Sequence, residues 1–271
     1  MIYTNIEYLT NELLNLILTD SSQYVSISFT KKPTNQLCQD INNKILASRK
    51  DIIFRLYGKG TEWINLDFLQ YLTNLEILQF DPYKIDNLVG IEFLVMLKKL
   101  RIGFPSSPSF SIKNITELKN LKCLYIIGKI TNQLDILSLL NLDCLFIDEF
   151  ENLNINLISN MDNLKKLSIT NGKVVKKMVF NLPKNLKYLN LSDINGFSEL
   201  PDLTQLPDLT ILSLSNIKKI GEIPDFTTCK NLTGIRLEKV SNLSNLKDIS
   251  TIQNLEEFAF YKLGKQSSSN F

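Results

Sequence analysis

The sequence predicts an α/β repeat solenoid in which about eleven short strands stack side by side in parallel. The first observation is a six-residue pattern, L-x-x-L-x-L, that recurs through most of the 271 residues. The second is its spacing, since the middle apolar residues of successive units lie between 21 and 27 residues apart. Self-similarity at a period of about 20–50 residues is the sequence signature of stacked repeat architectures. The middle residues, in order, are Ile27, Phe54, Leu78, Leu100, Leu124, Leu145, Leu167, Leu189, Leu212, Ile235 and Phe258.

Each unit is predicted to form a short strand followed by a return segment. Alternate residues of a strand point to opposite faces, so the apolar residues of the pattern turn to one side. One unit cannot bury that side alone, and a core forms only when neighbouring strands line up their leucines in columns. Between the strands lies a second apolar set at roughly helical spacing, as in Ile91, Leu94 and Leu97. The returns are therefore predicted to be single helical turns or short helices, with tighter 3₁₀ or extended turns in later units where prolines such as Pro207 intervene.

The two ends of the chain are predicted to differ. Residues 4–19 are expected to form a helix that caps the first unit, because a solenoid must cover the open end of its core. Residues 35–48 are expected to form a second helix within the first return. No comparable segment follows Tyr261, so we expect a weakly capped last strand and a flexible tail. We therefore expect one domain over 1–271, with a helical cap over 1–22, repeats over 23–263 and the tail over 264–271. The apolar stripe of the capping helix is Ile6, Leu9, Leu13, Leu16 and Ile17.

These repeats resemble those of the leucine-rich-repeat superfamily, in its short, bacterial-like class of about 22 residues per unit. The resemblance covers residues 20–263 and implies a curved solenoid with a concave parallel sheet. It implies little about the ligand, because a fold does not determine a function. The family's buried asparagine usually occupies the ninth repeat position, which here holds Ile194 or Ile217 in two of the later units. Either the asparagine ladder is shifted by one place or apolar packing replaces it. The polar residues one place earlier are Asn171, Asp193 and Asn216.

The composition excludes several classes of enzyme. The chain has no histidine, which removes Ser-His-Asp and Cys-His catalytic groups as well as histidine metal sites. Its ten glycines form no phosphate-binding loop, no dinucleotide fingerprint and no nucleophile elbow. We therefore expect no catalytic residue, no metal site and no cofactor, and a protein that is not an enzyme.

The cysteines and the first residues favour a cytoplasmic protein that does not enter a membrane. Cys38, Cys123, Cys144 and Cys229 include no C-x-x-C pair and are too scattered for a disulfide framework, so we expect reduced thiols. The first residues lack the basic start of a signal peptide. No uncharged apolar run reaches the roughly 20 residues that span a bilayer.

The residues that flank each middle residue are expected to face away from the core, on the concave surface. The core does not need aromatic residues there, and aromatic anchors within a polar rim are typical of protein interfaces. We therefore predict a rigid protein-binding face that recognises an acidic patch on another protein. The predicted anchors are Tyr125, Phe146 and Tyr188, and the basic residues that select the partner are Lys99, Arg101 and Lys166.

Several alternatives stay open. The aromatic residues could simply pack on one another as cross-strand pairs. Nucleic acid is disfavoured as a partner, because the net charge is only +2 and acidic residues near Asp143 interrupt the line of lysines at the strand starts. These lysines are Lys98, Lys122, Lys165 and Lys187. A structural or self-associating solenoid could instead use its weakly capped C-terminal edge to form a homodimer. By analogy, a short single-domain solenoid also suits a bacterial inhibitor, immunity or adaptor protein.

Overall fold

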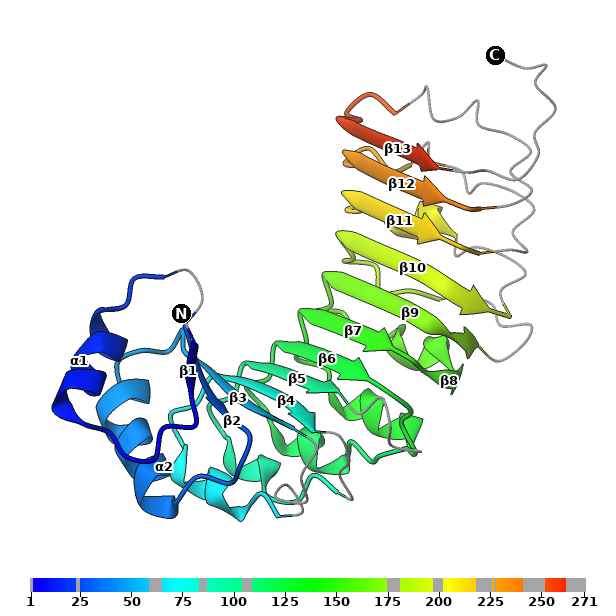
Figure 1. The fold of residues 1–271 in the computed structure, drawn as a ribbon. Coiled ribbons are helices and arrows are strands. Elements are labelled where there is room, and N and C mark those ends of the chain that lie inside the picture. The colour runs from blue at the N-terminus through cyan, green and yellow to red at the C-terminus, as the bar shows by residue number, and fades with distance from the viewer. Residues whose placement is uncertain are drawn as a thin grey trace. The chain divides into compact units, whose positions relative to one another are not determined.

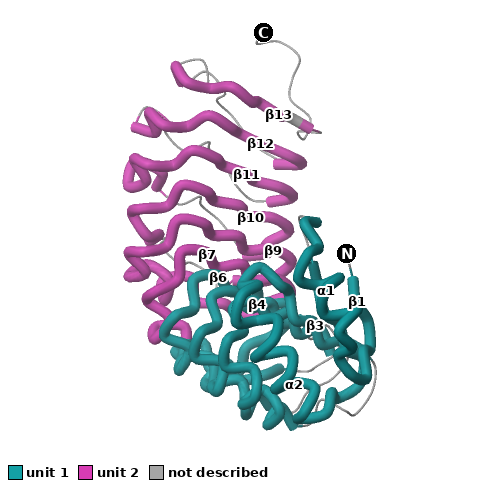
Figure 2. Tube along the Cα trace, turned by 90° about the vertical axis from the view of Figure 1, so that its left-hand side faces the viewer, with its two compact units in different colours: residues 1–135 teal, residues 136–271 magenta. Residues whose placement is uncertain are grey.

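The computed structural model of the chain divides into two compact units, residues 1–135 and residues 136–271 (Figure 2). Its strands form one parallel sheet in chain order, from β1 (Ile2–Thr4) to β13 (Glu257–Tyr261), with the short strand β8 (Glu151–Leu153) pairing β9 (Lys166–Val174) off this path (Figure 1). This order confirms the predicted fold class, whereas the single-domain organisation stays a prediction. The structure describes residues 2–22, 25–58, 65–82, 87–103, 109–174, 181–196, 202–217, 226, 228–240 and 252–261.

The described residues of unit 1 form six of these strands, two α-helices and a series of short turns. Its further strands are β2 (Ser26–Phe29), β3 (Ile53–Gly58), β4 (Ile77–Pro82), β5 (Lys99–Gly103) and β6 (Cys123–Ile127). Its helical segments are α1 (Asn11–Thr19), α2 (Asn35–Ile41), the π-helical turn η1 (Asn42–Leu46), and the 3₁₀ turns η2 (Asp67–Tyr71), η3 (Ile91–Phe93) and η4 (Lys113–Glu117).

Unit 2 contains strands and 3₁₀ turns, and its described residues include no α-helix. The turn η5 (Gln133–Ser138) contains the boundary between the units. Besides β8, β9 and β13, the elements of unit 2 are β7 (Cys144–Asp148), η6 (Ile155–Ile158), β10 (Tyr188–Asn195), η7 (Leu203–Gln205), β11 (Ile211–Ser215) and β12 (Gly234–Glu238).

The middle residues of the repeat stand opposite one another in each unit. In unit 1 the matched pairs run from Ile27 opposite Phe54 to Leu100 opposite Leu124. In unit 2 they run from Leu145 opposite Leu167 onward to the last strand, β13. All of these side chains except that of Phe258 are at most 1% exposed. Burying one such side chain contributes about 1.5–3 kcal/mol, so this column is a large contributor to stability. Its alignment confirms the predicted repeat.

The returns of the early repeats are 3₁₀ turns. This corrects the expectation that such tight turns belong to the later repeats. The return before β5 shows why. Its buried residues Leu88, Ile91, Leu94 and Leu97 recur every third position. The amide of Ile91 donates to the carbonyl of Leu88, and that of Leu94 to Ile91, each at 3.1 Å. A 3₁₀-helix has three residues per turn, so this period places every apolar side chain on one face without any proline.

The predicted capping helix is correct only over its second half. Residues 2–4 form β1, which extends the sheet beside β2, and the helix α1 begins at Asn11. Thr10 ends the extended segment, because its hydroxyl accepts the amide of Leu13 at 3.1 Å and caps the helix. Ile17 is fully buried, whereas Leu16 is 54% exposed, so the predicted stripe is wrong at Leu16.

The second predicted helix is present as α2 followed by η1, and Thr34 caps α2 by accepting the amide of Leu37 at 3.2 Å. The predicted tail, 264–271, lies outside the described residues. No helix in the described ranges is long and apolar enough to cross a membrane.

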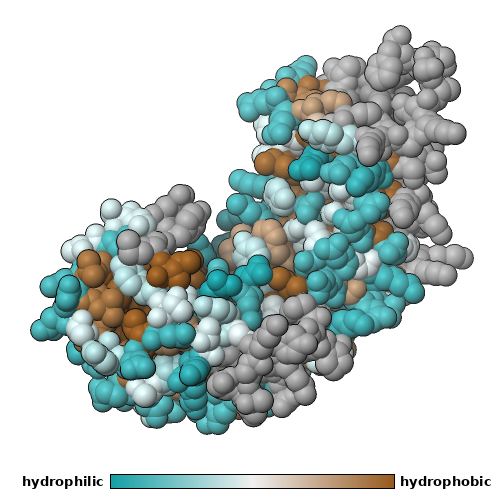
Figure 3. Space-filling model, viewed as in Figure 1, coloured by the Kyte–Doolittle hydropathy of each residue, from teal (hydrophilic) through white to brown (hydrophobic). Residues whose placement is uncertain are grey.

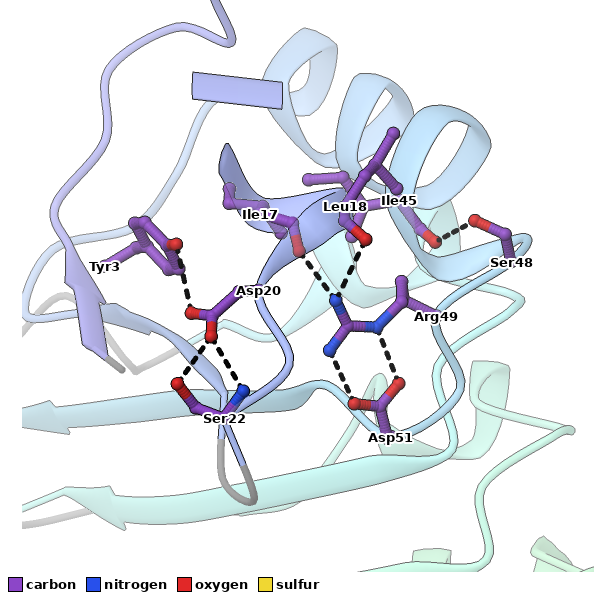
Figure 4. A network of polar contacts seen from close by, with 9 residues as sticks. All are labelled: Tyr3, Ile17, Leu18, Asp20, Ser22, Ile45, Ser48, Arg49 and Asp51. Atoms are coloured by element: carbon purple, nitrogen blue, oxygen red, sulfur yellow. Dashed lines mark hydrogen bonds and ion pairs between the residues drawn. The ribbon is translucent and has the colours of Figure 1, made fainter. Parts of the chain in front are cut away.

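Arg49 fastens the C-terminal end of α1 to the chain that enters β3 (Figure 4). Its Nη1 donates to the carbonyl of Ile17 at 2.7 Å, and its Nε and Nη2 donate to the Asp51 carboxylate at 2.9 and 2.7 Å. The hydrogen bonds from Arg49 hold the pKa of Asp51 below its usual value. Charged groups that pair in this forked geometry give the strongest type of hydrogen bond, so this contact secures the cap.

Candidate functional site

The side chains beside each middle residue point to the face of the sheet opposite the returns, which we call the open face. On β7, for example, Leu145 and Ile147 are buried, while Cys144, Phe146 and Asp148 between and around them are half-buried. This alternation is the period of a strand with one face in the core. The open face therefore has a first flanking column, one residue before each middle residue, and a second flanking column, one residue after it.

In unit 1, all three of the predicted binding residues lie on the open face. Lys99 stands in the first column and is exposed. Arg101 and Tyr125 stand in the second column and are directly opposite each other on β5 and β6. Adjacent strands lie about 4.8 Å apart, so these two side chains are neighbours. Tyr125 is 36% exposed, which is enough to present its ring on this face.

In unit 2, the other three predicted residues also lie on the open face but in different columns. Phe146 stands in the second column, opposite Ser168. Lys166 and Tyr188 stand in the first column, opposite each other on β9 and β10. The strand β9 thus separates the two aromatic residues, and they do not form a cross-strand pair. Tyr188 has the exposed Ile211 opposite it on its other side.

Two further charged residues, Asp81 and Arg55, belong to the same part of the open face as Arg101 and did not stand out in the sequence. Asp81, on β4, lies between Arg101 and Arg55, and its carboxylate oxygens are 3.2 Å from Arg101 Nε and 3.6 Å from Arg55 Nη2. The guanidinium of Arg55 also lies over the ring of Tyr57, 4.8 Å from its centre. Arg55 precedes the first clear repeat, so the pattern that revealed Arg101 did not single it out.

The strands of unit 2 end in a polar ladder that is shifted by one place from the usual family position. The residues at this place have left-handed backbones, with φ of +51° at Asn171, +53° at Asp193 and +50° at Asn216. Asparagine and aspartate tolerate this conformation better than other residues with side chains. The Nδ2 of Asn171 donates to Asp148 at 2.8 Å, and that of Asn216 donates to Asp193. Successive repeats are therefore linked by side chains at this edge.

Apolar packing fills the ninth position itself. Ile194, Ile217 and Val240 are at most 3% exposed. Both of the alternatives raised by the sequence therefore hold together, since the ladder moves by one place and the vacated position joins the core.

A second asparagine ladder, which was not predicted from the sequence, runs along the returns. The asparagine directly before the first leucine of the pattern donates its Nδ2 to a backbone carbonyl of the preceding repeat. The signal was present, since this Asn-Leu pair recurs in most units. The bonds are Asn120 to Val95 at 2.8 Å, Asn163 to Leu140 at 3.0 Å, Asn185 to Asp162 at 2.7 Å, Asn231 to Pro207 at 3.2 Å and Asn254 to Lys230 at 2.8 Å.

The line of lysines at the strand starts is partly neutralised. Lys98 lies 2.8 Å from Glu76, and Lys165 lies 3.8 Å from Asp143. In the parts of the chain that the structure describes, no three acidic or cysteine side chains come together as metal ligands would.

Each of the four cysteines is a thiol rather than half of a disulfide, and Cys38 and Cys229 are buried. Burial raises the pKa of the Cys38 thiol to about 12, so this thiol stays protonated and unreactive.

Comparison with solved structures identifies similar folds. Internalin C2 from Listeria monocytogenes is 21% identical, over 83% of this chain and 84% of that one, with a TM-score of 0.51. A TDR receptor is 18% identical, with a TM-score of 0.51 over 93% of this chain, which spans only 49% of the receptor. A leucine-rich-repeat protein from Leptospira interrogans is 18% identical over 95% and 82% of the two chains, with a TM-score of 0.42. No protein-family model and no curated protein sequence matches the chain.

At these identities the likeness concerns the fold. The repeat period, the parallel register and the buried middle column lead to the same conclusion. The chain has the fold of the leucine-rich-repeat proteins.

Proposed function

We propose that this chain is a non-enzymatic protein-binding module that uses the open face of its sheet. One observation carries the proposal. The middle column is buried, yet the columns beside it present aromatic and basic side chains that the core does not require, above all Tyr125 opposite Arg101. Aromatic residues and arginine are the side chains that most often dominate binding energy at protein interfaces.

The mechanism is rigid presentation. In this proposal Tyr125, Phe146 and Tyr188 are the anchors, and Lys99, Arg101 and Lys166 favour a partner with an acidic patch. Each lies on a strand that pairs with its neighbours, so its backbone loses little freedom when a partner binds. We further propose that the protein works in the cytoplasm as an inhibitor, immunity or adaptor protein, where its cysteine thiols would stay reduced.

Affinity capture from the native cell lysate tests the proposal. The wild type is compared with a Tyr125→Ala, Phe146→Ala, Tyr188→Ala variant of equal thermal stability. A matched control, Phe93→Ala with Val95→Ala, removes exposed apolar groups from the return segment η3 and the residues after it. We expect a protein that is captured by the wild type and the control but lost by the triple variant. A partner lost only by the control would move the site to the returns.

A self-associating solenoid is a second candidate, favoured by one observation at β13. Phe258 occupies a middle position, yet it is 45% exposed, and Tyr261 on the same strand is 56% exposed. A charge on an edge strand opposes pairing with another strand. If this edge pairs with a second copy, the mass in solution will fall from dimer to monomer in Tyr261→Lys and stay unchanged in the triple variant of the open face. A monomer in every variant rejects this candidate.

A further inference from the structure

We propose that Arg55 and Arg101 form a binding site for a carboxylate of an acidic partner, an aspartate or glutamate side chain, on the open face of unit 1. This inference rests on the proposed use of the open face for protein binding and names the chemistry that it recognises there. Arg55, Gln79 and Arg101 stand opposite one another on β3, β4 and β5, so the two guanidinium groups lie on either side of one strand.

Arg55 has donors that the protein does not use. Its Nε is buried without a hydrogen-bond partner among the described residues. Its contact with Asp81, at 3.6 Å from Nη2, is an ion pair that is too long for a hydrogen bond. The side chain is 38% exposed and is held mainly by the ring of Tyr57 beneath it. A guanidinium has five N–H donors, so this group can turn to a ligand without breaking a hydrogen bond.

Arg101 is oriented but not saturated. Its Nε donates to Asp81 Oδ1 at 3.2 Å, and its side chain is 41% exposed. Its Nη1 and Nη2 have no hydrogen-bond partner within the residues that the structure describes. A forked guanidinium with free terminal nitrogens matches the two oxygens of a carboxylate.

Asp81 positions both arginines and leaves the site positively charged. Gly103 makes room for it, since a Cβ atom on residue 103 would lie 2.9 Å from Asp81 Oδ1. Two guanidinium groups and one carboxylate give this cluster a charge of +1, and the exposed Lys99 lies on the same strand as Arg101. A carboxylate carries the single negative charge that neutralises such a cluster.

Arginine side-chain NMR tests this site directly, because the chain has only four arginines and so only four Nε–H signals. The full-length protein, labelled with ¹⁵N-arginine, is titrated with a hexaglutamate peptide and, separately, with a phosphoserine peptide of the same length. Arg49 and Arg236 serve as internal controls. Arg49 already donates to Asp51 through both Nε and Nη2, and Arg236 stands opposite Ser213 and Ala259, away from the other arginines on the open face. We expect hexaglutamate to shift the signals of Arg55 and Arg101 and to leave those of Arg49 and Arg236 in place.

Variants give the second readout. Arg55→Lys and Arg101→Lys keep the charge but lose the fork, and each is expected to weaken hexaglutamate binding about tenfold. Arg236→Lys, on the open face of unit 2, is expected to leave the affinity unchanged. Asp81→Asn removes the competing carboxylate and is expected to tighten binding.

Three results would overturn the site. These are equal shifts at all four arginines, no shift at any of them, and tighter binding of the phosphoserine peptide. The probe is synthetic, so a failure here leaves the capture experiment on the open face to be judged separately.

Discussion

The ring of Phe150 lies against the backbone of Gly172 so closely that a Cβ atom on residue 172 would come within 2.5 Å of ring carbons Cδ1 and Cε1. Phe150 is 5% exposed and belongs to the repeat before that of Gly172, while Ile194 lies opposite Gly172 in the next repeat. These three residues hold the ninth position in successive repeats. One repeat thus supplies a large ring, and the next supplies the empty space for it.

Gly172→Ala is therefore expected to destabilise the protein by about 1–3 kcal/mol, because the added methyl group must displace an aromatic ring in a packed core. Gly234→Ala is the matched control, since residue 234 also lies in a strand and its nearest neighbour would be Ile211 Cγ1 at an ordinary 3.6 Å. Urea denaturation of both variants measures the difference. Equal losses in the two variants would contradict the close packing of Phe150.

Leu189→Ala is expected to cost about 2–5 kcal/mol, because Leu189 is fully buried in the middle column and its removal leaves a cavity. Ile211→Ala is the control, since Ile211 is 42% exposed on the open face of the adjacent strand β11. Its loss is expected to stay below about 1 kcal/mol. The free energies of unfolding of both variants provide the test, and a Leu189→Ala loss as small as that of the control would reject the repeat alignment.

Asn231→Ala is expected to lower the free energy of unfolding by about 0.5–1.5 kcal/mol, because the Nδ2 of Asn231 donates a hydrogen bond to the Pro207 carbonyl in the preceding repeat. Asn195→Ala is a suitable comparison, since Asn195 is exposed on β10 and makes no side-chain hydrogen bond to any described residue. Thermal unfolding of the two variants distinguishes them. If they melt at the same temperature, the asparagine ladder along the returns does not contribute to stability.

Acid is expected to weaken the N-terminal end of unit 1. The hydrogen bonds from Arg49 lower the pKa of Asp51, and those from the Ser22 hydroxyl and amide lower the pKa of Asp20. A carboxyl with a lowered pKa in the folded state contributes stability that is fully present above its unfolded pKa, about 3.9, and is lost as pH falls through the folded pKa. The Tm is therefore expected to fall as the pH drops below about 4.

Asp51→Asn tests the origin of that fall. The variant is expected to have a lower Tm than the wild type near neutral pH and a smaller decrease in acid, because it no longer has this carboxyl to protonate. Circular dichroism melts across the acid range measure both curves. Parallel curves for the two proteins would show that the contact between Arg49 and Asp51 does not set the acid sensitivity.

The surface of the helix α1 shows that a sequence pattern does not predict which apolar side chains are buried. Hydrophobic side chains gather over α1, and hydrophilic and hydrophobic residues alternate across the strands (Figure 3). In α1 the exposed Leu16 and the buried Ile17 are both apolar, so helical periodicity alone assigned both to the core. Tertiary contacts decide such cases, because the apolar stripe of a short helix is wider than the surface against which it packs.

The candidate site was only partly visible in the sequence for a similar reason. Register places Arg101 beside Tyr125, and that followed from the repeat alignment. The repeat alignment did not predict that Arg55 and Arg101 both approach the Asp81 carboxylate. That approach depends on side chains that reach diagonally toward β4 and on the space left at Gly103. No periodicity encodes either of these.

Periodicity along the sequence is enough to predict the repeat, the column of buried residues and the parallel order of the strands. A period of about 22 residues leaves one register in which the apolar middle residues line up, and all of them except Phe258 are buried. Stacking of the strands determines which polar residues meet between neighbouring repeats, as Asn171 meets Asp148 and Arg101 meets Asp81. Such pairings depend on distances of a few ångströms between side chains, and residues some twenty positions apart acquire those distances only when the strands have stacked.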